Sequence, residues 1–174
     1  MLRAGVVGLG MVLAGCVPMA APDVVLADVP LVRSDGTNIG TVRVFQENTG
    51  VVLRVDAHGL PAGQHGVHLH AVGSCEAPKF TSAGPHWNPT SKQHGHQNPN
   101  GYHWGDLGNL GVGADGVLTA GLLVPGARLR TDGNGDGPVL LDADGAALVF
   151  HAGADDEKTD PSGNSGDRIA CAVL

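Results

Sequence analysis

The chain has 174 residues, of which 42% are hydrophobic, 16% charged and 3% aromatic, and this length suits one domain of ordinary size. Its 28 glycines and 11 prolines exceed average usage and favour short strands joined by turns. The net charge is −7 with histidine neutral, and no cluster of three or more basic residues occurs. Nucleic-acid binding needs a basic surface, commonly with aromatic platforms, so we expect no nucleic acid partner.

The first residues have the pattern of an export signal. Met1-Leu2-Arg3 is a short positive start, and the apolar run 4–14 that follows is too short to span a bilayer core of roughly 30 Å. The run ends in Leu13-Ala14-Gly15-Cys16, which resembles the bacterial lipoprotein signal that is cut before a lipid-bearing cysteine. We therefore expect a signal peptide at 1–15, a lipid on Cys16 and a tether at 16–23. The protein would then be a membrane-anchored lipoprotein facing the periplasm or the cell exterior. The alternative is a plain secretory signal cleaved near Ala20-Ala21.

From residue 24 onward, short β-branched runs alternate with turn signals. The runs predict strands at 24–29, 41–45, 51–55, 67–72, 117–124, 146–151 and 168–174. Turns are predicted at Ser34-Asp35-Gly36, Asn48-Thr49-Gly50, Ala114-Asp115-Gly116 and Ala143-Asp144-Gly145. Because no segment has a sustained helical period, we expect residues 24–174 to form one all-β domain, an antiparallel sandwich or barrel.

Two long stretches, 73–104 and 152–167, lack the strand pattern, and loops of this length in a compact domain are usually functional or disordered. The cysteines support export. With Cys16 used by the lipid, Cys75 and Cys171 remain, and an exported pair without a third competitor is expected to form a disulfide. No CxxC spacing indicates structural zinc.

Histidines are concentrated around the first of these stretches. Six of the nine lie between residues 65 and 96. A disordered His-rich tract is one interpretation, but His68 and His70 fall on a predicted strand, where residues two apart share a face. His151 ends another predicted strand. Further along the first loop, nitrogen and oxygen donors of the kinds that zinc accepts follow one another: His86, His94, His103 and Asp106.

Four motifs, in this order, resemble the copper/zinc superoxide dismutase family. They are Gly66-Val67-His68-Leu69-His70, Thr81-Ser82-Ala83-Gly84-Pro85-His86-Trp87-Asn88-Pro89, His103-Trp104-Gly105-Asp106-Leu107-Gly108-Asn109 and Gly163-Asn164-Ser165-Gly166-Asp167-Arg168-Ile169-Ala170-Cys171. The likeness runs from about residue 24 to the end. It implies a Greek-key, immunoglobulin-like β-barrel with two long functional loops. It also implies an enzyme that converts superoxide to dioxygen and hydrogen peroxide with copper and zinc.

The resemblance further implies roles for individual residues. Copper would be bound by His68, His70, His86 and His151, and zinc by His86, His94, His103 and Asp106. His86 would bridge the two metals and take up a proton while copper alternates between two oxidation states. Arg168 would attract the anion and is, with His86, a predicted catalytic residue. Asp155 would accept hydrogen bonds from His68 and His94, and Cys75 and Cys171 would form the family's disulfide.

The sequence also departs from the family. Gly153 stands where familiar eukaryotic forms have lysine, the loop before Arg168 is shorter, and Asp167 adjoins that arginine. We therefore expect weaker guidance of superoxide, with Lys158 as a compensating cation. His96 is the alternative to His94 as a zinc ligand.

Two histidines and one acidic segment receive simpler interpretations. We expect His58 and His65 to be surface or packing residues. Segment 132–137 opens like a calcium loop, but its twelfth position is Ala143 instead of glutamate. We therefore interpret it as a glycine-rich connection.

Two other classes of function stay open. A non-catalytic copper- and zinc-binding lipoprotein on the same scaffold would lack a copper ligand or the arginine, and this sequence has all of them. A structural adhesion sandwich would not explain converging histidines. Because the chain stops soon after Cys171, we expect a monomer or a weak homodimer.

Overall fold

The computed structural model describes residue 1 and residues 24–130 and 136–174. Apart from Met1, the predicted signal peptide, the tether and Cys16 lie outside the described residues, as does most of the calcium-like segment. The part of the chain that the structure describes contains no helix with the length and hydrophobicity needed to span a bilayer.

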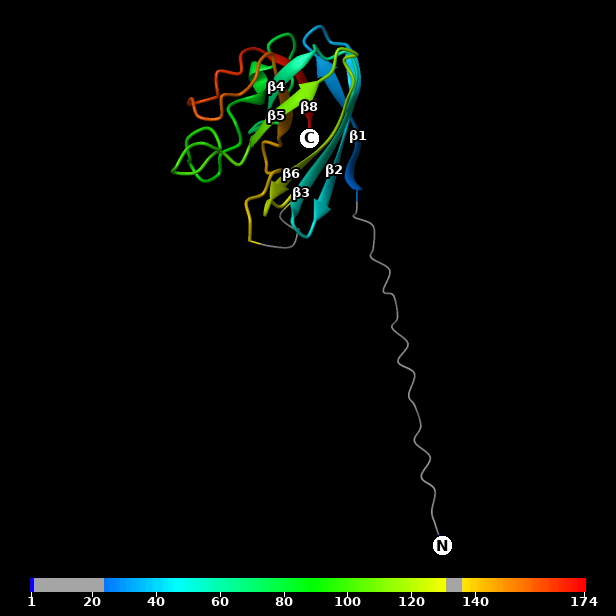
Figure 1. Cartoon of the computed structure of the whole chain (residues 1–174), viewed down its shortest axis with the longest axis vertical. Helices are drawn as coiled ribbons and strands as arrows, with labels where there is room; N and C mark the ends of the chain where they lie inside the picture. Colours follow the sequence, from blue (N-terminus) through cyan, green and yellow to red (C-terminus); the bar gives the residue numbers. More distant parts are fainter. Residues whose placement is uncertain (2–23, 131–135) are drawn as a thin grey trace.

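The described chain forms one antiparallel sheet that is nearly closed into a barrel (Figure 1). The strand order is β5-β4-β7-β8-β1-β2-β3-β6, and the two end strands, β5 and β6, also contact each other. β4 pairs with β5 and β7 rather than with β3, so the connection 58–62 crosses one end of the barrel in Greek-key fashion. The predicted all-β antiparallel fold is confirmed. The strands are β1 (Val24–Arg33), β2 (Asn38–Glu47), β3 (Gly50–Ala57), β4 (Gly63–His70), β5 (Asp106–Val112), β6 (Leu118–Pro125), β7 (Ala147–His151) and β8 (Arg168–Val173).

Most predicted strands are longer at one or both ends than expected, and in two places strand pairing explains the difference. β5 was not predicted, because Gly108 and Gly111 interrupt its pattern; it forms where β4 offers a partner, with Gly63 opposite Val112. The strand predicted at 67–72 begins earlier, at Gly63, because its first residues pair with β5. It ends at His70 because the Ala71 N–H donates instead to the Pro85 carbonyl at 2.9 Å.

Alternation along β4 separates the side chains of the barrel core from those of His68 and His70. Val67 and Leu69 are fully buried in the main hydrophobic core, together with Leu53 and Phe150. Side chains of successive strand residues point to opposite faces, so His68 and His70 share the other face of β4. Both side chains are completely buried, so other segments of the chain must cover this face of β4.

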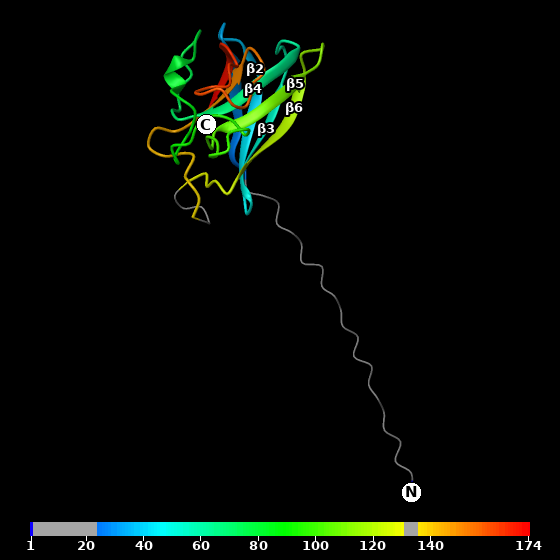
Figure 2. The same ribbon diagram turned by 60° about the vertical axis from the view of Figure 1, so that its left-hand side comes forward.

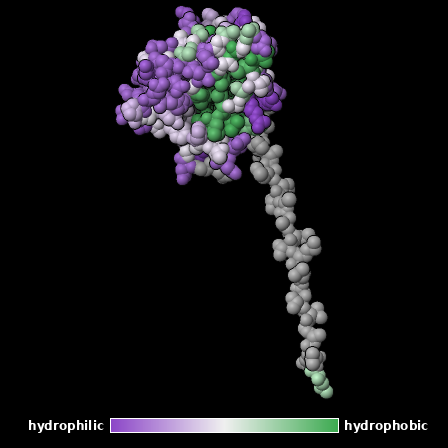
Figure 3. Space-filling view, viewed as in Figure 1, coloured by the Kyte–Doolittle hydropathy of each residue, from purple (hydrophilic) through white to green (hydrophobic). Residues whose placement is uncertain are grey.

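The cover comes from the two long loops. The first, 71–105, contains a short 3₁₀ helix (Thr81–Ala83), and the second, 152–167, joins β7 to β8. Figures 1 and 2 show the two loops, green and orange to red, on one side of the barrel, and Figure 3 shows mostly hydrophilic residues there. They are joined directly, since the His94 N–H donates to Asp160 Oδ1 at 2.7 Å and the Gln97 N–H to the Glu157 carbonyl at 3.0 Å.

A disulfide links the first loop to the barrel. Cys75 and Cys171 are bonded, with their Cα atoms 5.8 Å apart, as predicted. Cys171 lies on β8 and is fully buried with Phe80 and Val149 in a small hydrophobic cluster under the loop. The bond therefore fixes the start of the first loop to the last strand.

Candidate metal centre

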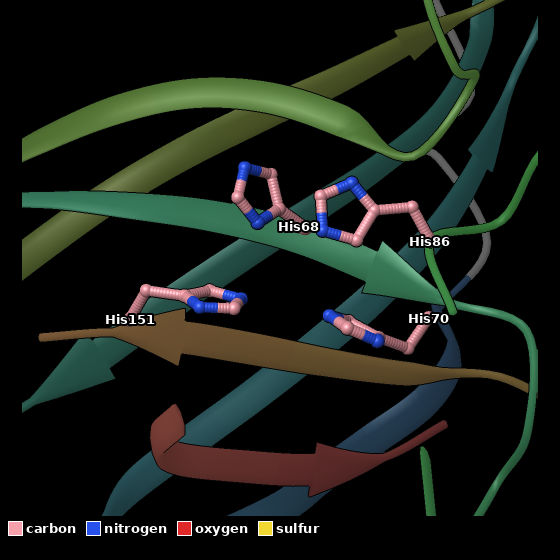
Figure 4. A group of neighbouring side chains, drawn as sticks. All are labelled: His68, His70, His86 and His151. Carbon is pink, nitrogen blue, oxygen red and sulfur yellow. The ribbon is translucent and has the colours of Figure 1, made fainter. Parts of the chain in front are cut away.

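Four histidines from three segments converge between the sheet and the loops, as Figure 4 shows. His68 and His70 come from β4, and His151 ends the neighbouring strand β7. His86 comes from the first loop, which runs along the end of β4 because the Trp87 N–H donates to the Leu69 carbonyl at 2.8 Å. Local strand pairing thus places all four rings together.

In each of three rings, one nitrogen donates to a fixed acceptor. The His70 Nδ1–H donates to the Gly84 carbonyl at 2.8 Å, and the His151 Nδ1–H to the Gly166 carbonyl at 3.1 Å. The His68 Nε2–H donates to Asp155 Oδ2 at 2.7 Å. These bonds set the tautomers, so the opposite nitrogens carry lone pairs directed at one another.

Those opposite nitrogens have no hydrogen-bond partner among the described residues. His68 Nδ1 and the Nε2 atoms of His70, His86 and His151 are all buried and unpaired, and the four lie within 4.8 Å of one another. An unpaired buried polar atom is costly. A metal ion that accepts imidazole lone pairs would satisfy all four atoms at once, and copper binds such nitrogens strongly.

A second set of donors surrounds Asp106. Its Oδ1 atom lies 2.8 Å from His86 Nδ1, 3.0 Å from His94 Nδ1 and 3.2 Å from His103 Nδ1. The four donors form a buried group within 4.8 Å, and three imidazoles with one carboxylate match what zinc accepts. His86 offers Nδ1 to this set and Nε2 to the first, so one ring joins the two sets.

His86 and His151 are in the protonation state that favours metal binding at the first set. Burial lowers the pKa of His86 to about 4 and that of His151 to about 3, which leaves both imidazoles neutral at neutral pH. At the second set, burial opposes the charged form of His94, but the Asp106 and Asp155 carboxylates raise its pKa to about 9. A metal at the second set would therefore displace a proton from His94.

Asp155 connects the two sets from outside. Its Oδ2 accepts from His68, and its Oδ1 accepts from the His94 Nε2–H at 2.9 Å, the arrangement expected from the sequence. Although burial opposes ionisation, the hydrogen bonds from His68 and His94 hold the pKa of Asp155 below its usual range. The second loop packs tightly against this carboxylate, because a Cβ atom on Gly163, at φ +63°, would meet Asp155.

Arg168 lies at the rim of the first set. Its guanidinium donates to the carbonyls of Phe80 and Gly84, at 2.7 Å each, and the Gly84 carbonyl is the one that also accepts from His70. A cavity of about 520 Å³ opens at Arg168 and is also lined by Lys79 and Asp167. Lys79 therefore supplies a cation here that the sequence analysis did not consider.

The structure distinguishes His94 from His96. The ring of His96 lies 4.1 Å from that of Tyr102, centroid to centroid, and its Nδ1 is 3.3 Å from Glu157 Oε2. It is not part of either donor set. Sequence reasoning also gave no role to the Gly84 carbonyl or to the side chain of Asn109, because neither is marked by a pattern of residue types.

A model of the copper/zinc superoxide dismutase (SODC) family matches residues 38–174. The chain belongs to this family. It is 43% identical over 141 residues to a superoxide dismutase [Cu-Zn] of Caulobacter vibrioides, covering 80% of each chain. It is 41% identical over 148 residues to a superoxide dismutase-like protein of Bacillus subtilis, covering 84% of this chain and 74% of that one.

Solved structures of the family have the same fold. A SOD-like protein from Bacillus subtilis matches with a TM-score of 0.78 and 40% identity, covering 84% of this chain and 97% of the other. The Cu/Zn superoxide dismutase from Brucella abortus matches with a TM-score of 0.64 and 26% identity, covering 85% of this chain and 98% of the other.

Proposed function

We propose that this family member is an active superoxide dismutase in which His68, His70, His86 and His151 bind copper, and His86, His94, His103 and Asp106 bind zinc. The observation that carries the proposal is the set of four buried imidazole nitrogens that face one another without a partner among the described residues. Two superoxide anions and two protons give one dioxygen and one hydrogen peroxide. Bound copper would supply the one-electron chemistry, because it has two accessible oxidation states.

The chain's own residues contribute the proton and the anion site. His86 would be held at Nδ1 by the zinc-binding set, so its Nε2 atom, when it is not bound to copper, could hold a proton and donate it to the reduced anion. Arg168, fixed by the Phe80 and Gly84 carbonyls, places a permanent positive charge beside the copper-binding set. The guanidinium attracts the small anion and donates hydrogen bonds to it.

A non-catalytic metal-binding protein on this scaffold is the second candidate, since one relative is named superoxide dismutase-like. Two solved structures of the SOD-like Bacillus protein are mutants in which histidine replaces a proline or both a tyrosine and a proline. The present chain brings four native histidines and Arg168 together. The complete set of four histidines with Arg168 favours the catalytic function over the non-catalytic one.

The test is replacement of His151 by Ala, with the variant and the parent protein both loaded with copper and zinc. We expect His151→Ala to lose copper-dependent superoxide dismutation and to keep zinc, because His151 belongs only to the first set. The exposed His58 provides the matched control, and His58→Ala should keep full activity and both metals. Full activity of His151→Ala would refute the ligand assignment. Bound copper without activity in the parent protein would favour the non-catalytic function.

We also propose that the protein is an exported lipoprotein anchored through Cys16. The sequence Leu13-Ala14-Gly15-Cys16 supports this, and the disulfide fits an oxidising compartment outside the cytoplasm. Cells fed radiolabelled palmitate should label the parent protein and not Cys16→Ser. Equal labelling of both proteins, or of neither, would contradict lipid attachment at Cys16.

A further inference from the structure

Asp160 is a carboxylate of the second loop that reaches the second donor set from outside. Its Oδ1 atom accepts a hydrogen bond from the His94 N–H at 2.7 Å and lies 3.9 Å from His103 Nε2. His94 and His103 both belong to the second set, and both are buried. One side chain of the second loop therefore meets two histidines that the first loop supplies to this set.

His94 is held at three points, and Asp160 provides the one on the backbone. The ring places Nδ1 3.0 Å from Asp106 Oδ1, and its Nε2–H donates to Asp155 Oδ1 at 2.9 Å. These two contacts orient the imidazole. The bond to Asp160 instead fixes the peptide from which the side chain starts, and a hydrogen bond to a charged carboxylate is stronger than a neutral one.

The outer nitrogen of His103 also faces Asp160. His103 Nδ1 lies 3.2 Å from Asp106 Oδ1, so a metal bound through Nδ1 leaves the ring proton on Nε2. Within the part of the chain that the structure describes, this nitrogen makes no hydrogen bond, and the Asp160 carboxylate lies beside it. Metal-binding imidazoles direct their other N–H at a carboxylate, a carbonyl or water. Asp160 is placed to attract that proton.

The second loop holds Asp160 in a closed turn. The Asp156 Oδ1 atom accepts from the N–H groups of Lys158 and Thr159, at 3.1 and 2.8 Å. The Gly163 N–H donates to the Thr159 carbonyl at 2.7 Å, and the Asp156 N–H donates to the Gly163 carbonyl at 2.8 Å. Hydrogen bonds thus enclose Asp160 on both sides along the chain, so metal binding would not have to order this segment.

The contacts of Asp160 differ from those of Asp155. Asp155 accepts from His68 of the first set and from His94 of the second. The histidines that Asp160 contacts, His94 and His103, belong to the second set and not to the first. Loss of Asp160 should therefore affect the second set and leave the first set unchanged.

We propose that Asp160 is a positioning residue for zinc, which holds His94 through its backbone and His103 through the charge beside its outer nitrogen. The inference rests on the proposed role of the second set as the zinc site. Asp160 would then set the affinity for zinc without setting that for copper. A residue that only stabilised the loop would change the melting temperature and not the geometry of the bound metal.

The experiment compares purified full-length Asp160→Ala and Asp160→Asn with the parent protein. Chelator competition measures zinc affinity, and the visible absorption of Co(II) placed in the second set reports the geometry of its ligands. We expect Asp160→Ala to bind zinc about tenfold more weakly, at the lower end of the effect of removing such a partner, and to shift the Co(II) bands. Asp160→Asn keeps an oxygen for the His94 N–H but loses the charge. It should lie between Asp160→Ala and the parent, and it provides the test if Asp160→Ala fails to fold.

The copper site provides an internal reference. With zinc saturating, both variants should give the Cu(II) electron paramagnetic resonance spectrum of the parent protein. A copper spectrum that changes as clearly as the Co(II) bands would overturn the selective role of Asp160.

Asp142→Ala is the matched control. Asp142 and Asp160 line the same cavity of about 510 Å³, but the Asp142 carboxylate accepts from the Asp144 N–H at 3.0 Å and belongs to neither donor set. Asp142→Ala should keep parent-like zinc affinity and Co(II) bands. An equal loss there would assign the effect to the charge of the cavity and overturn the positioning role.

Two further outcomes separate this inference from the proposed function. Parent-like zinc affinity and Co(II) bands in Asp160→Ala and Asp160→Asn would overturn the assignment of Asp160 alone. Failure of the parent protein to bind zinc would overturn the proposed zinc site and the role of Asp160 together.

Discussion

Asn109 binds both backbone polar groups of Asp155. Its side-chain Nδ2–H donates to the Asp155 carbonyl at 2.9 Å, and the Asp155 N–H donates to Asn109 Oδ1 at 2.7 Å. A residue of β5 thereby holds the second loop at the point where its carboxylate meets both donor sets. In the proposed metal sites, the carboxylate would influence the metals through His68 and His94, because its two oxygens fix the orientation of these rings.

Removal of the Asp155 carboxylate should weaken both metal sites. In Asp155→Ala, the outer nitrogens of His68 and His94 lose a charged acceptor, and we expect metal affinity to fall by about 10–100-fold. Competition titrations with chelators would measure both affinities. Asn109→Ala should produce a smaller loss in the same direction, because the carboxylate stays but its backbone is released. Unchanged affinities in Asp155→Ala would show that the two rings are oriented by other contacts.

Lys79 should assist the capture of superoxide. It lines the same cavity as Arg168, and a local positive field raises the encounter rate of an anion with a protein of net charge −7. We expect Lys79→Gln to lower kcat/KM by roughly two- to fivefold at low salt and to reduce the salt dependence of the rate. Pulse radiolysis at several ionic strengths would measure this. Lys158→Gln is the comparison, since Lys158 was the cation expected from the sequence; a larger effect there would assign the guidance to Lys158 instead.

Loss of the disulfide should destabilise the fold. The bond joins residues 96 positions apart, and the chain-entropy model gives roughly 4–5 kcal/mol for a loop of this length. We expect the double variant Cys75→Ser/Cys171→Ser to lose about that much free energy of unfolding in denaturant titrations of the metal-free protein. A loss below about 1 kcal/mol would mean that the unfolded chain is already compact.

Asp156 should make the stability of the second loop depend on pH. Hydrogen bonds from the Thr159 side chain and backbone lower the pKa of Asp156 from 3.8 to about 2. Because the folded state has the lower pKa, the ionised group stabilises the fold above about pH 4, and this contribution is lost as the pH falls toward 2. Asp156→Asn should therefore be less stable than the parent at pH 7, and the difference should shrink as the pH falls below about 4. Urea unfolding midpoints across this range would show it, and a difference that does not change with pH would contradict it.

Several features could be predicted from the sequence because neighbouring residues carry their signal. Alternating β-branched residues indicated most of the strands, and the spacing of His68 and His70 placed two donors on one face. The cysteine pair Cys75 and Cys171 was predicted by elimination. These predictions depend on local periodicity or on residue type.

Other features were decided only by the tertiary structure. β5 is a strand because β4 lies beside it, and Asn109 acquires its role from the backbone of Asp155, 46 residues away. The family resemblance already favoured His94 over His96, and the folded loop places His94 Nδ1 3.0 Å from Asp106 Oδ1. The physical reason is the same in each case: a side chain's hydrogen-bond partner is set by how distant segments pack. Residue type shows what Asn109 can donate and accept, and only the packing of the second loop against the barrel brings the backbone of Asp155 within reach.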